Sequence, residues 1–184
     1  MAAWSTWDTG ELERQVAVEP LKLIYWPAGI LRKVSLRLEQ PPATELVAGM
    51  KAIMRAHKGA GLSAIQVGVA QRLVVVDSGV LGPSVFVNPH ILEFCGERVK
   101  MREGCLSVPG FFEDIPRAPE VVVDYYDESM VCHHEVRLHG FMAHVLQHEM
   151  EHLDGKLYLD HLPNVRRGAI MGQMQSLRRQ GLLK

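Results

Sequence analysis

The pattern of apolar and polar residues predicts three helices in this chain. Apolar side chains recur at helical spacing over residues 43–57, 141–153 and 168–182. The first stretch stops before Gly59 and the second before Asp154-Gly155, and glycine commonly ends a helix. Residues 1–20 are polar and weakly patterned, which predicts a short helix or a loose arm.

Short runs of β-forming residues fill the region between the first two helices. These candidate strands cover residues 73–77, 85–87, 91–94, 98–101, 120–126 and 131–138. We expect 91–94 to pair with 98–101, and 120–126 to form a hairpin with 131–138 across a turn that starts at Asp127. Tyr158 and Leu159 also have strand-like character.

Strands that come in a block before the last two helices indicate an α+β fold rather than a βαβ series. We expect short, mostly antiparallel strands packed around a central helix at 141–153, with N-terminal and C-terminal helices in addition. The chain has 184 residues, which is the size of one domain. We therefore expect a single domain over 1–184, with an arm at 1–20 and the C-terminal helix within 166–184.

The composition excludes several classes of protein. Lys and Arg number 20 against 21 Asp and Glu, and this balance argues against a general DNA binder. The longest apolar run is 73–76, far short of the roughly 20 residues that cross a bilayer, so no membrane partner is expected. Residues 1–20 lack a cationic start and an apolar block, which predicts neither a signal nor a transit peptide. Three cysteines are too few for a disulfide framework, so we expect a cytoplasmic protein.

The most informative stretch is His148-Glu149-Met150-Glu151-His152, an HExxH motif on the predicted central helix. Residues four apart are neighbours on one helical face, so both imidazoles can reach one metal ion. Glu149 stands beside them as a candidate general base. The motif therefore predicts a hydrolytic metal centre, which needs a third protein ligand.

Residues near the motif do not supply that third ligand. His144 lies eight residues before His152, about 12 Å along the helix axis, so one ion cannot bind both. Tyr158 stands where a metzincin has its third histidine. Asp160 is the only acid after the motif region, and no helix there carries the glutamate of a thermolysin-like site. An upstream ligand remains, and the cysteines are the natural candidates.

Cysteines occur at three upstream positions. Cys105 follows Glu103-Gly104. We interpret Cys95 and Cys132 as small buried hydrophobic residues. His133 and His134 point to opposite faces of a predicted strand, so we interpret them as surface histidines rather than as a paired site.

Three segments resemble the signature motifs of the peptide deformylases, in order and in separation. They are Gly59-Ala60-Gly61-Leu62-Ser63-Ala64-Ile65-Gln66, Glu103-Gly104-Cys105-Leu106-Ser107 and Gln147-His148-Glu149-Met150-Glu151-His152-Leu153-Asp154-Gly155. The segment 31–34 also resembles the family's N-terminal region, so the likeness spans about 21–162. Glu151 replaces the usual Asp, and Ser63 replaces a commoner Ala. Neither change removes a catalytic atom, and we expect Glu151 to alter the geometry around the ligands.

The resemblance implies a role for the residues of these motifs. The metal ligands would be Cys105, His148 and His152, with water in the fourth position. Glu149 would take a proton from that water and deliver it to the leaving amine. The side-chain amide of Gln66 and the backbone N–H of Leu106 would stabilise the oxyanion.

The resemblance also implies a substrate, a metal and partners. The enzyme would remove the formyl group from an N-formylmethionyl nascent peptide and release formate. Residues expected around the substrate are Ala60, Gly61, Glu103, Phe141, His144 and Val145. His144 is unusual there, because the position is often aliphatic, and it raises the question of how polar the pocket is. The family commonly uses Fe(II), which would make the protein oxygen-sensitive, and accepts Zn, Ni or Co.

The C-terminal helix has two interpretations. Ile170, Met174 and Leu177 share one face, so the helix could simply pack on the core with its arginines in solvent. Alternatively, the basic helix could dock the protein on the ribosome, as some bacterial deformylases are thought to do. A bacterial cytoplasm is the expected location, with an organelle as the alternative.

Two other functions remain open from the sequence. A zinc metallopeptidase would take its third ligand elsewhere and would tolerate loss of Cys105. A non-enzymatic metal-binding or translation-associated protein would keep the fold without turnover. Glu149 argues against the second, because a purely structural site has no need of a base beside an open position.

Overall fold

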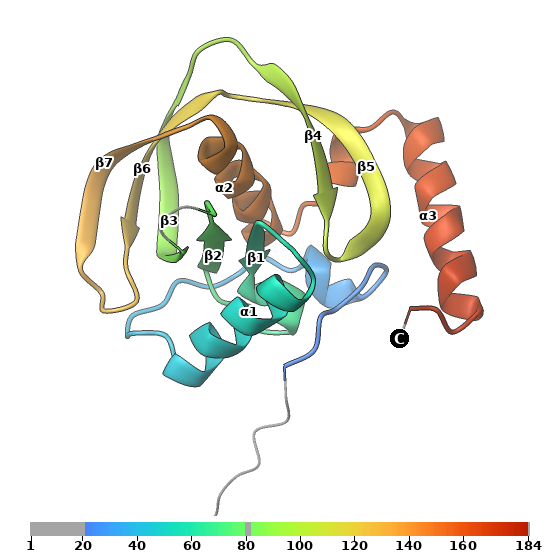
Figure 1. Cartoon of the computed structure of the whole chain (residues 1–184), viewed down its shortest axis with the longest axis horizontal. Coiled ribbons are helices and arrows are strands. Elements are labelled where there is room, and N and C mark those ends of the chain that lie inside the picture. The colour runs from blue at the N-terminus through green and yellow to red at the C-terminus, as the bar shows by residue number, and fades with distance from the viewer. Residues whose placement is uncertain (1–20, 80–81, 184) are drawn as a thin grey trace, which may run out of the picture.

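The computed structural model describes residues 21–79 and 82–183, so the arm expected at 1–20 lies outside the described residues. Its helices are α1 (Thr44–Ala56), α2 (Gly140–Leu153) and α3 (Asn164–Arg179), with 3₁₀ turns at Gly29–Arg32, Ala64–Val67 and Tyr158–His161 (Figure 1). Its strands are β1 (Gly61–Ser63), β2 (Leu73–Asp77), β3 (Pro83–Cys95), β4 (Val99–Cys105), β5 (Val108–Arg117), β6 (Glu120–Tyr126) and β7 (Cys132–His139). None of the helices in this part of the chain has the length and apolar character needed to cross a bilayer.

The strands form two separate sheets. Five of them lie in the order β1-β2-β3-β6-β7, while β4 and β5 form a two-stranded ribbon. All pairings between these strands are antiparallel. Helix α2 contacts β1, β2, β6 and β7, and in Figure 1 it sits between the larger sheet and the ribbon. This arrangement of helices and antiparallel strands confirms the expected α+β class.

Helix α2 is buried because both of its sides are covered. The side that faces the larger sheet packs Leu146 and Leu153 against Val74 and Phe86. The other side carries four polar residues within 148–152, of which His148, Glu149 and His152 are buried. Polar groups at this depth need hydrogen-bond partners, and the β4–β5 ribbon and β1 supply them.

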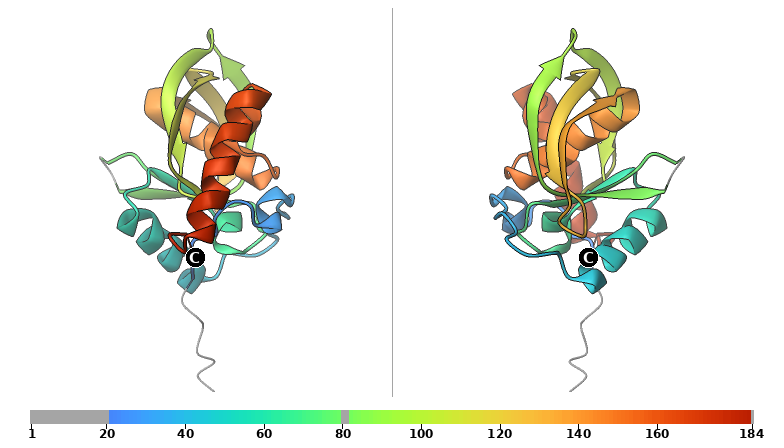
Figure 2. Two further views of the ribbon diagram at one scale, coloured as in Figure 1. Left: turned by 90° about the vertical axis from the view of Figure 1, so that its right-hand side faces the viewer. Right: turned by 90° about the vertical axis from the view of Figure 1, so that its left-hand side faces the viewer.

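Helix α3 covers the outer side of the ribbon. Ile170 and Met174 are buried with Ile115 of β5, as the face predicted from the sequence requires. Arg166 donates a hydrogen bond to Glu113 of β5 at 2.7 Å. Figure 2 shows the helix running along the outside of the molecule at this point. The helix begins at Asn164, directly after Pro163, and so starts earlier than the sequence pattern indicated.

The strand prediction was wrong where a bulge bends one long strand. Residues 85–87 and 91–94 belong to the single strand β3 and not to two strands. Asn88 adopts a positive φ of 51°, and its side chain exchanges two hydrogen bonds with the backbone of Leu38. The register shifts between Val87 and His90, so the chain turns without leaving the sheet. The polar Asn-Pro pair marks this bulge rather than a strand end.

The expected partner of residues 91–94 was also wrong. Ile91 and Phe94 face Val123 and Val121 of β6, whereas residues 99–101 lie in β4, which pairs with β5. Strand β5 contains Pro109, Gly110 and Pro116, which the sequence pattern marks as turn residues. Proline is tolerated there because a strand of a two-stranded ribbon leaves one edge without ladder hydrogen bonds. Tyr158 and Leu159, expected to be strand-like, lie in a 3₁₀ turn.

Candidate metal centre

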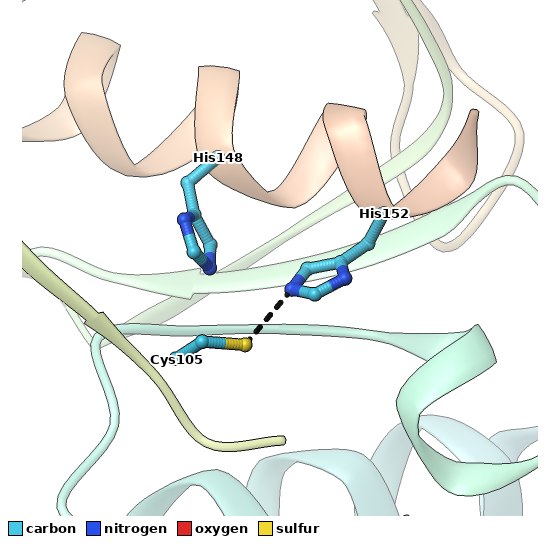
Figure 3. Close-up of side chains that lie close together, drawn as sticks. All are labelled: Cys105, His148 and His152. Carbon is cyan, nitrogen blue, oxygen red and sulfur yellow. Dashed lines mark hydrogen bonds between the residues drawn. The ribbon is translucent and has the colours of Figure 1, made fainter. Parts of the chain in front are cut away.

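Three potential metal ligands converge between α2 and the end of β4. The ligand atoms of Cys105, His148 and His152 all lie within 4.8 Å of one another. Figure 3 shows the imidazoles of His148 and His152 extending from successive turns of α2 toward the thiol of Cys105. The Sγ atom of Cys105 lies 3.2 Å from Nε2 of His152. All three side chains are buried, so the cluster is held rigidly by its surroundings.

This donor set fits a single metal ion. Ligand atoms bound about 2.0–2.3 Å from one tetrahedral ion lie roughly 3.5 Å apart. The 3.2 Å between Cys105 and His152, and the 4.8 Å limit for the whole cluster, are compatible with this spacing. One thiol and two imidazoles leave a fourth position for water or substrate. His144, one turn earlier on α2, is absent from the cluster, as the rise of the helix predicts.

Cys105 reaches the helix because the ribbon is irregular at its tip. The register of β4 and β5 shifts between Gly104 and Cys105, which turns the thiol toward α2. Gly104 has no side chain, and a Cβ there would meet the ring of Phe112 at 2.7 Å. The glycine of this motif therefore allows the ring of Phe112 to pack against the backbone next to Cys105.

Glu103 connects the ligands to a buried ionic network. One of its oxygens accepts a hydrogen bond from Nδ1 of His148 at 3.0 Å, and the other is bonded to Nε2 of His144. Arg117 donates two hydrogen bonds to the same carboxylate, at 2.7 and 2.8 Å. Burial alone would raise the pKa of Glu103, but these donors, Arg117 first, hold it far below its ordinary value. The ionised carboxylate orients His148 and leaves its Nε2 free to bind a metal.

The same arginine explains how the chain accommodates Glu151. Arg117 also donates to Glu151 at 3.0 Å, and the other oxygen of Glu151 lies 2.7 Å from Nε2 of His161. The longer side chain thus bridges a buried guanidinium and a surface imidazole. Arg117 was not recognised from the sequence, because an arginine in a β-rich run carries no motif.

Glu149 lies on the cavity side of the ligands and is almost fully buried. Its Oε2 lies 2.7 Å from the hydroxyl of Ser63 on β1. Burial raises the pKa of Glu149, while the neighbouring His148 and the Ser63 hydroxyl act in the opposite direction. The serine that replaces the commoner alanine at position 63 therefore has a role of its own, since its hydroxyl bonds to the carboxylate of Glu149.

Glycine is required at position 61 because Glu149 leaves no room for a side chain. A Cβ on Gly61 would lie 2.6 Å from Oε1 of Glu149 and 2.8 Å from Val145. Strand β1 can therefore pass directly against α2, and its backbone borders the cavity.

A cavity of about 390 Å³ opens beside these groups. Its walls include all six residues expected around the substrate: Ala60, Gly61, Glu103, Phe141, His144 and Val145. Both nitrogens of His144 are turned away from solvent, since Nε2 is tied to Glu103 and Nδ1 is buried without a partner. Met101, Phe111 and Phe112 also line the cavity and were not singled out in the sequence. The walls are thus largely apolar despite the histidine.

The two expected oxyanion donors, Leu106 and Gln66, lie at different places around the cluster. Leu106 lines the cavity directly after Cys105. Gln66 is buried, its Oε1 accepts from the backbone of Ser63, and its Nε2 lies 3.1 Å from the hydroxyl of Ser107 and 3.6 Å from Sγ of Cys105. The amide of Gln66 is therefore held in place immediately beside the cluster.

The interpretation of the other two cysteines as buried residues was wrong. Cys95 and Cys132 are both partly exposed, and only Cys105 is buried. His133 and His134 lie near the surface, as expected, but each faces a carboxylate, Asp127 and Asp124 respectively.

Comparison with known proteins gives a consistent result. The family model described as polypeptide deformylase matches residues 20–168. The peptide deformylase of Hahella chejuensis is 38% identical over 159 residues, which cover 84% of this chain and 94% of that protein. The crystal structure of a peptide deformylase from Legionella pneumophila has a TM-score of 0.82 and 33% identity, covering 89% of this chain and 98% of that one. The peptide deformylase from Ehrlichia chaffeensis in complex with actinonin gives a TM-score of 0.81 at 32% identity, covering 86% of this chain and 98% of that one.

Proposed function

The chain belongs to the peptide deformylase family, and from this premise we propose that Cys105, His148 and His152 hold one divalent metal ion beside Glu149. The protein is a hydrolase that removes the N-formyl group from newly made polypeptides. The observation that carries the proposal is the convergence of a thiol and two imidazoles next to a buried carboxylate, at a cavity with apolar walls.

The donor set favours a soft or borderline metal because one ligand is a thiolate. We propose Fe(II) as the physiological ion, with Zn, Ni or Co able to replace it in purified protein. When bound, the ion supplies Lewis acidity, which acidifies a water molecule and polarises the formyl oxygen.

Glu149 is the proposed general base. Its carboxylate is buried, faces the cavity and is fixed by Ser63, so it can take a proton from water and later deliver it to the leaving amine. The raised pKa of Glu149 suits its role as the base, because a carboxylate with an ordinary pKa is a weaker base and would take the proton from water less readily.

The remaining residues bind and orient the substrate. The backbone N–H of Leu106 and the side-chain amide of Gln66 are the proposed donors to the oxyanion that forms from the formyl oxygen. Gly61 offers its backbone to the extended peptide, and the methionine side chain enters the cavity beside Phe141, His144 and Val145.

A formate-release assay tests the substrate and the metal together. Protein purified without oxygen is expected to release formate from formyl-Met-Ala-Ser and to leave acetyl-Met-Ala-Ser intact. Handling in air is expected to lower both the iron content and the activity, because Fe(II) bound by a thiolate is readily oxidised. Equal iron and equal activity in the two preparations would contradict the assignment of Fe(II).

Cleavage of a peptide bond instead of formate release would favour the metallopeptidase, and no turnover by metal-loaded protein would favour the binding protein.

The C-terminal helix supports a proposed contact with the ribosome in a bacterial cytoplasm. Helix α3 turns Ile170 and Met174 to the core and leaves Arg178 and Arg179 exposed. Cations at this end of the helix would attract phosphate groups of ribosomal RNA.

Reversing those two charges tests the contact. The double variant Arg178→Glu, Arg179→Glu is expected to lose most of its co-sedimentation with ribosomes while it keeps formate release from the short peptide. Arg55→Glu, at an exposed cation on α1, serves as the matched control. Unchanged co-sedimentation of the double variant would contradict ribosome docking through α3.

A further inference from the structure

A second cluster of chemically active side chains lies on the β6–β7 hairpin. Sγ of Cys132 lies 3.2 Å from Nε2 of His134, and Nδ1 of His134 lies 3.4 Å from Oδ2 of Asp124. Sγ also lies 3.9 Å from Nδ1, so the imidazole contacts both the thiol and the carboxylate, but the three groups do not form a straight line. None of the three borders the 390 Å³ cavity of the metal centre.

A bulge in the hairpin brings these residues onto one face. Tyr126 pairs with Cys132 and Val123 with Val136, but the register shifts between Val123 and Tyr125. Glu135 takes a positive φ of 50° at this point, and its backbone N–H donates to Oδ1 of Asp124 at 2.8 Å. This hydrogen bond leaves Oδ2 of Asp124 for the imidazole. His90 of β3 lies opposite Asp124 on the other side of β6.

The same contacts favour the ionised, negatively charged form of Asp124. The backbone N–H of Glu135, and then His134, lower the pKa of Asp124 below its ordinary value. An ionised Asp124 accepts the proton on Nδ1 of His134, which leaves Nε2 as the free acceptor that faces Cys132.

The geometry of this cluster differs from that of a metal site. Within the described residues, only Cys105, His148 and His152 bring three ligand atoms within 4.8 Å of one another. In the hairpin the imidazole contacts both the thiol and the carboxylate, but the three ligand atoms do not all lie within 4.8 Å of one another. The order is that of a nucleophile, a base and a carboxylate that orients the base.

We infer that Cys132 is a solvent-accessible nucleophilic thiol, activated by His134 and Asp124, that exchanges with low-molecular-weight disulfides. In this step Sγ of Cys132 attacks one sulfur of the disulfide, and a new S–S bond forms as the old one breaks. The second sulfur leaves as a thiolate with the bonding electron pair, and the thiol proton moves to Nε2 of His134. Cys132 is thereby oxidised to a mixed disulfide, and one half of the small disulfide is reduced.

Cys95 provides an internal comparison for this reactivity. It is partly exposed like Cys132, but it ends β3 beside acidic side chains. Burial, and then the negative charges of Glu93 and Glu120, raise the pKa of Cys95. The two cysteines thus have similar access, but Cys132 contacts an imidazole whereas Cys95 lies beside carboxylates.

The reaction of metal-loaded full-length protein with dithiobis-nitrobenzoate, an aromatic disulfide, tests the inference. We expect a fast phase of thiolate release that Cys132→Ser removes and Cys95→Ser leaves in place. His134→Ala is expected to slow this phase about tenfold. A larger effect is not expected, because a free cysteine is already a few per cent thiolate at neutral pH. Asp124→Asn, which keeps the shape of the side chain, should slow the phase to a smaller degree.

His133→Ala is the matched control for the imidazole. His133 is the adjacent residue, but it faces Asp127 and stacks on Tyr125 on the other side of the strand. The fast phase should be unchanged in this variant, and formate release should be unchanged in all variants of the hairpin. A fast phase that survives Cys132→Ser, or equal rates in His134→Ala and His133→Ala, would overturn the inference.

Discussion

Replacing Glu149 with glutamine is expected to lower the rate of formate release by about 10³-fold, within the range that a positioned acid–base group contributes. The amide has the shape of the carboxylate and can still bond to Ser63, so the cavity should keep its form. It cannot take up a proton, however, and the attack of water then loses its base. Formate release and metal content should be measured on the same preparation. The two measurements together distinguish loss of the general base from loss of the metal.

Two further variants make this prediction specific. Cys105→Ser is expected to abolish formate release by losing the metal, whereas Glu149→Gln should retain it. Glu151→Gln, two residues away, should keep activity within about tenfold, because its carboxylate bonds to Arg117 and His161 rather than facing the cavity. A Glu149→Gln variant with activity close to the wild type would contradict the assignment of Glu149 as the base.

The pH dependence of the wild-type protein should agree with this role. The base acts in its ionised form, so activity must fall as the pH drops through the pKa of Glu149. Because burial raises that pKa, the fall should occur at a higher pH than for an ordinary carboxyl group. Glu149→Gln should remove this acidic limb from the profile of its residual activity.

The parts of this protein that depend on local spacing could be predicted from the sequence. His148 and His152 are neighbours on any helix, and the apolar pattern over 141–153 predicts that helix. Cys105 could be placed beside His148 and His152 only through its resemblance to a family, because its approach to α2 depends on the fold of the β4–β5 ribbon.

The contacts between distant segments could not be predicted. Strand β5 of the ribbon could not be predicted because Pro109 and Pro116, which it contains, are typical of turns. Arg117 and Ser63 lie 34 and 86 residues from the acids to which they bond on α2, and nothing in either local sequence marks a partner. Hydrogen bonds of this kind follow from tertiary packing, which brings the groups together and excludes water from them.

Replacing Arg117 with methionine is expected to destabilise the protein by about 3–5 kcal/mol. This is the typical cost of removing one partner of a buried ion pair. The side chains of Arg117 and Glu103 are only 3% and 7% exposed. Methionine fills a similar space but leaves Glu103 ionised in the interior with two of its hydrogen bonds missing. Urea unfolding of protein saturated with metal measures the change in free energy.

A partly exposed ion pair elsewhere in the molecule supplies the control. Lys51 and Glu128 lie 3.0 Å apart, with side chains 25% and 52% exposed. Lys51→Met should cost less than about 1 kcal/mol, because solvent screens such pairs and hydrates the remaining carboxylate. Equal losses from the two substitutions would mean that the charge of Glu103 is not stabilised by Arg117. A large loss confined to Arg117→Met, together with weaker metal binding, would instead show that one buried arginine both stabilises the fold and orients His148 through Glu103.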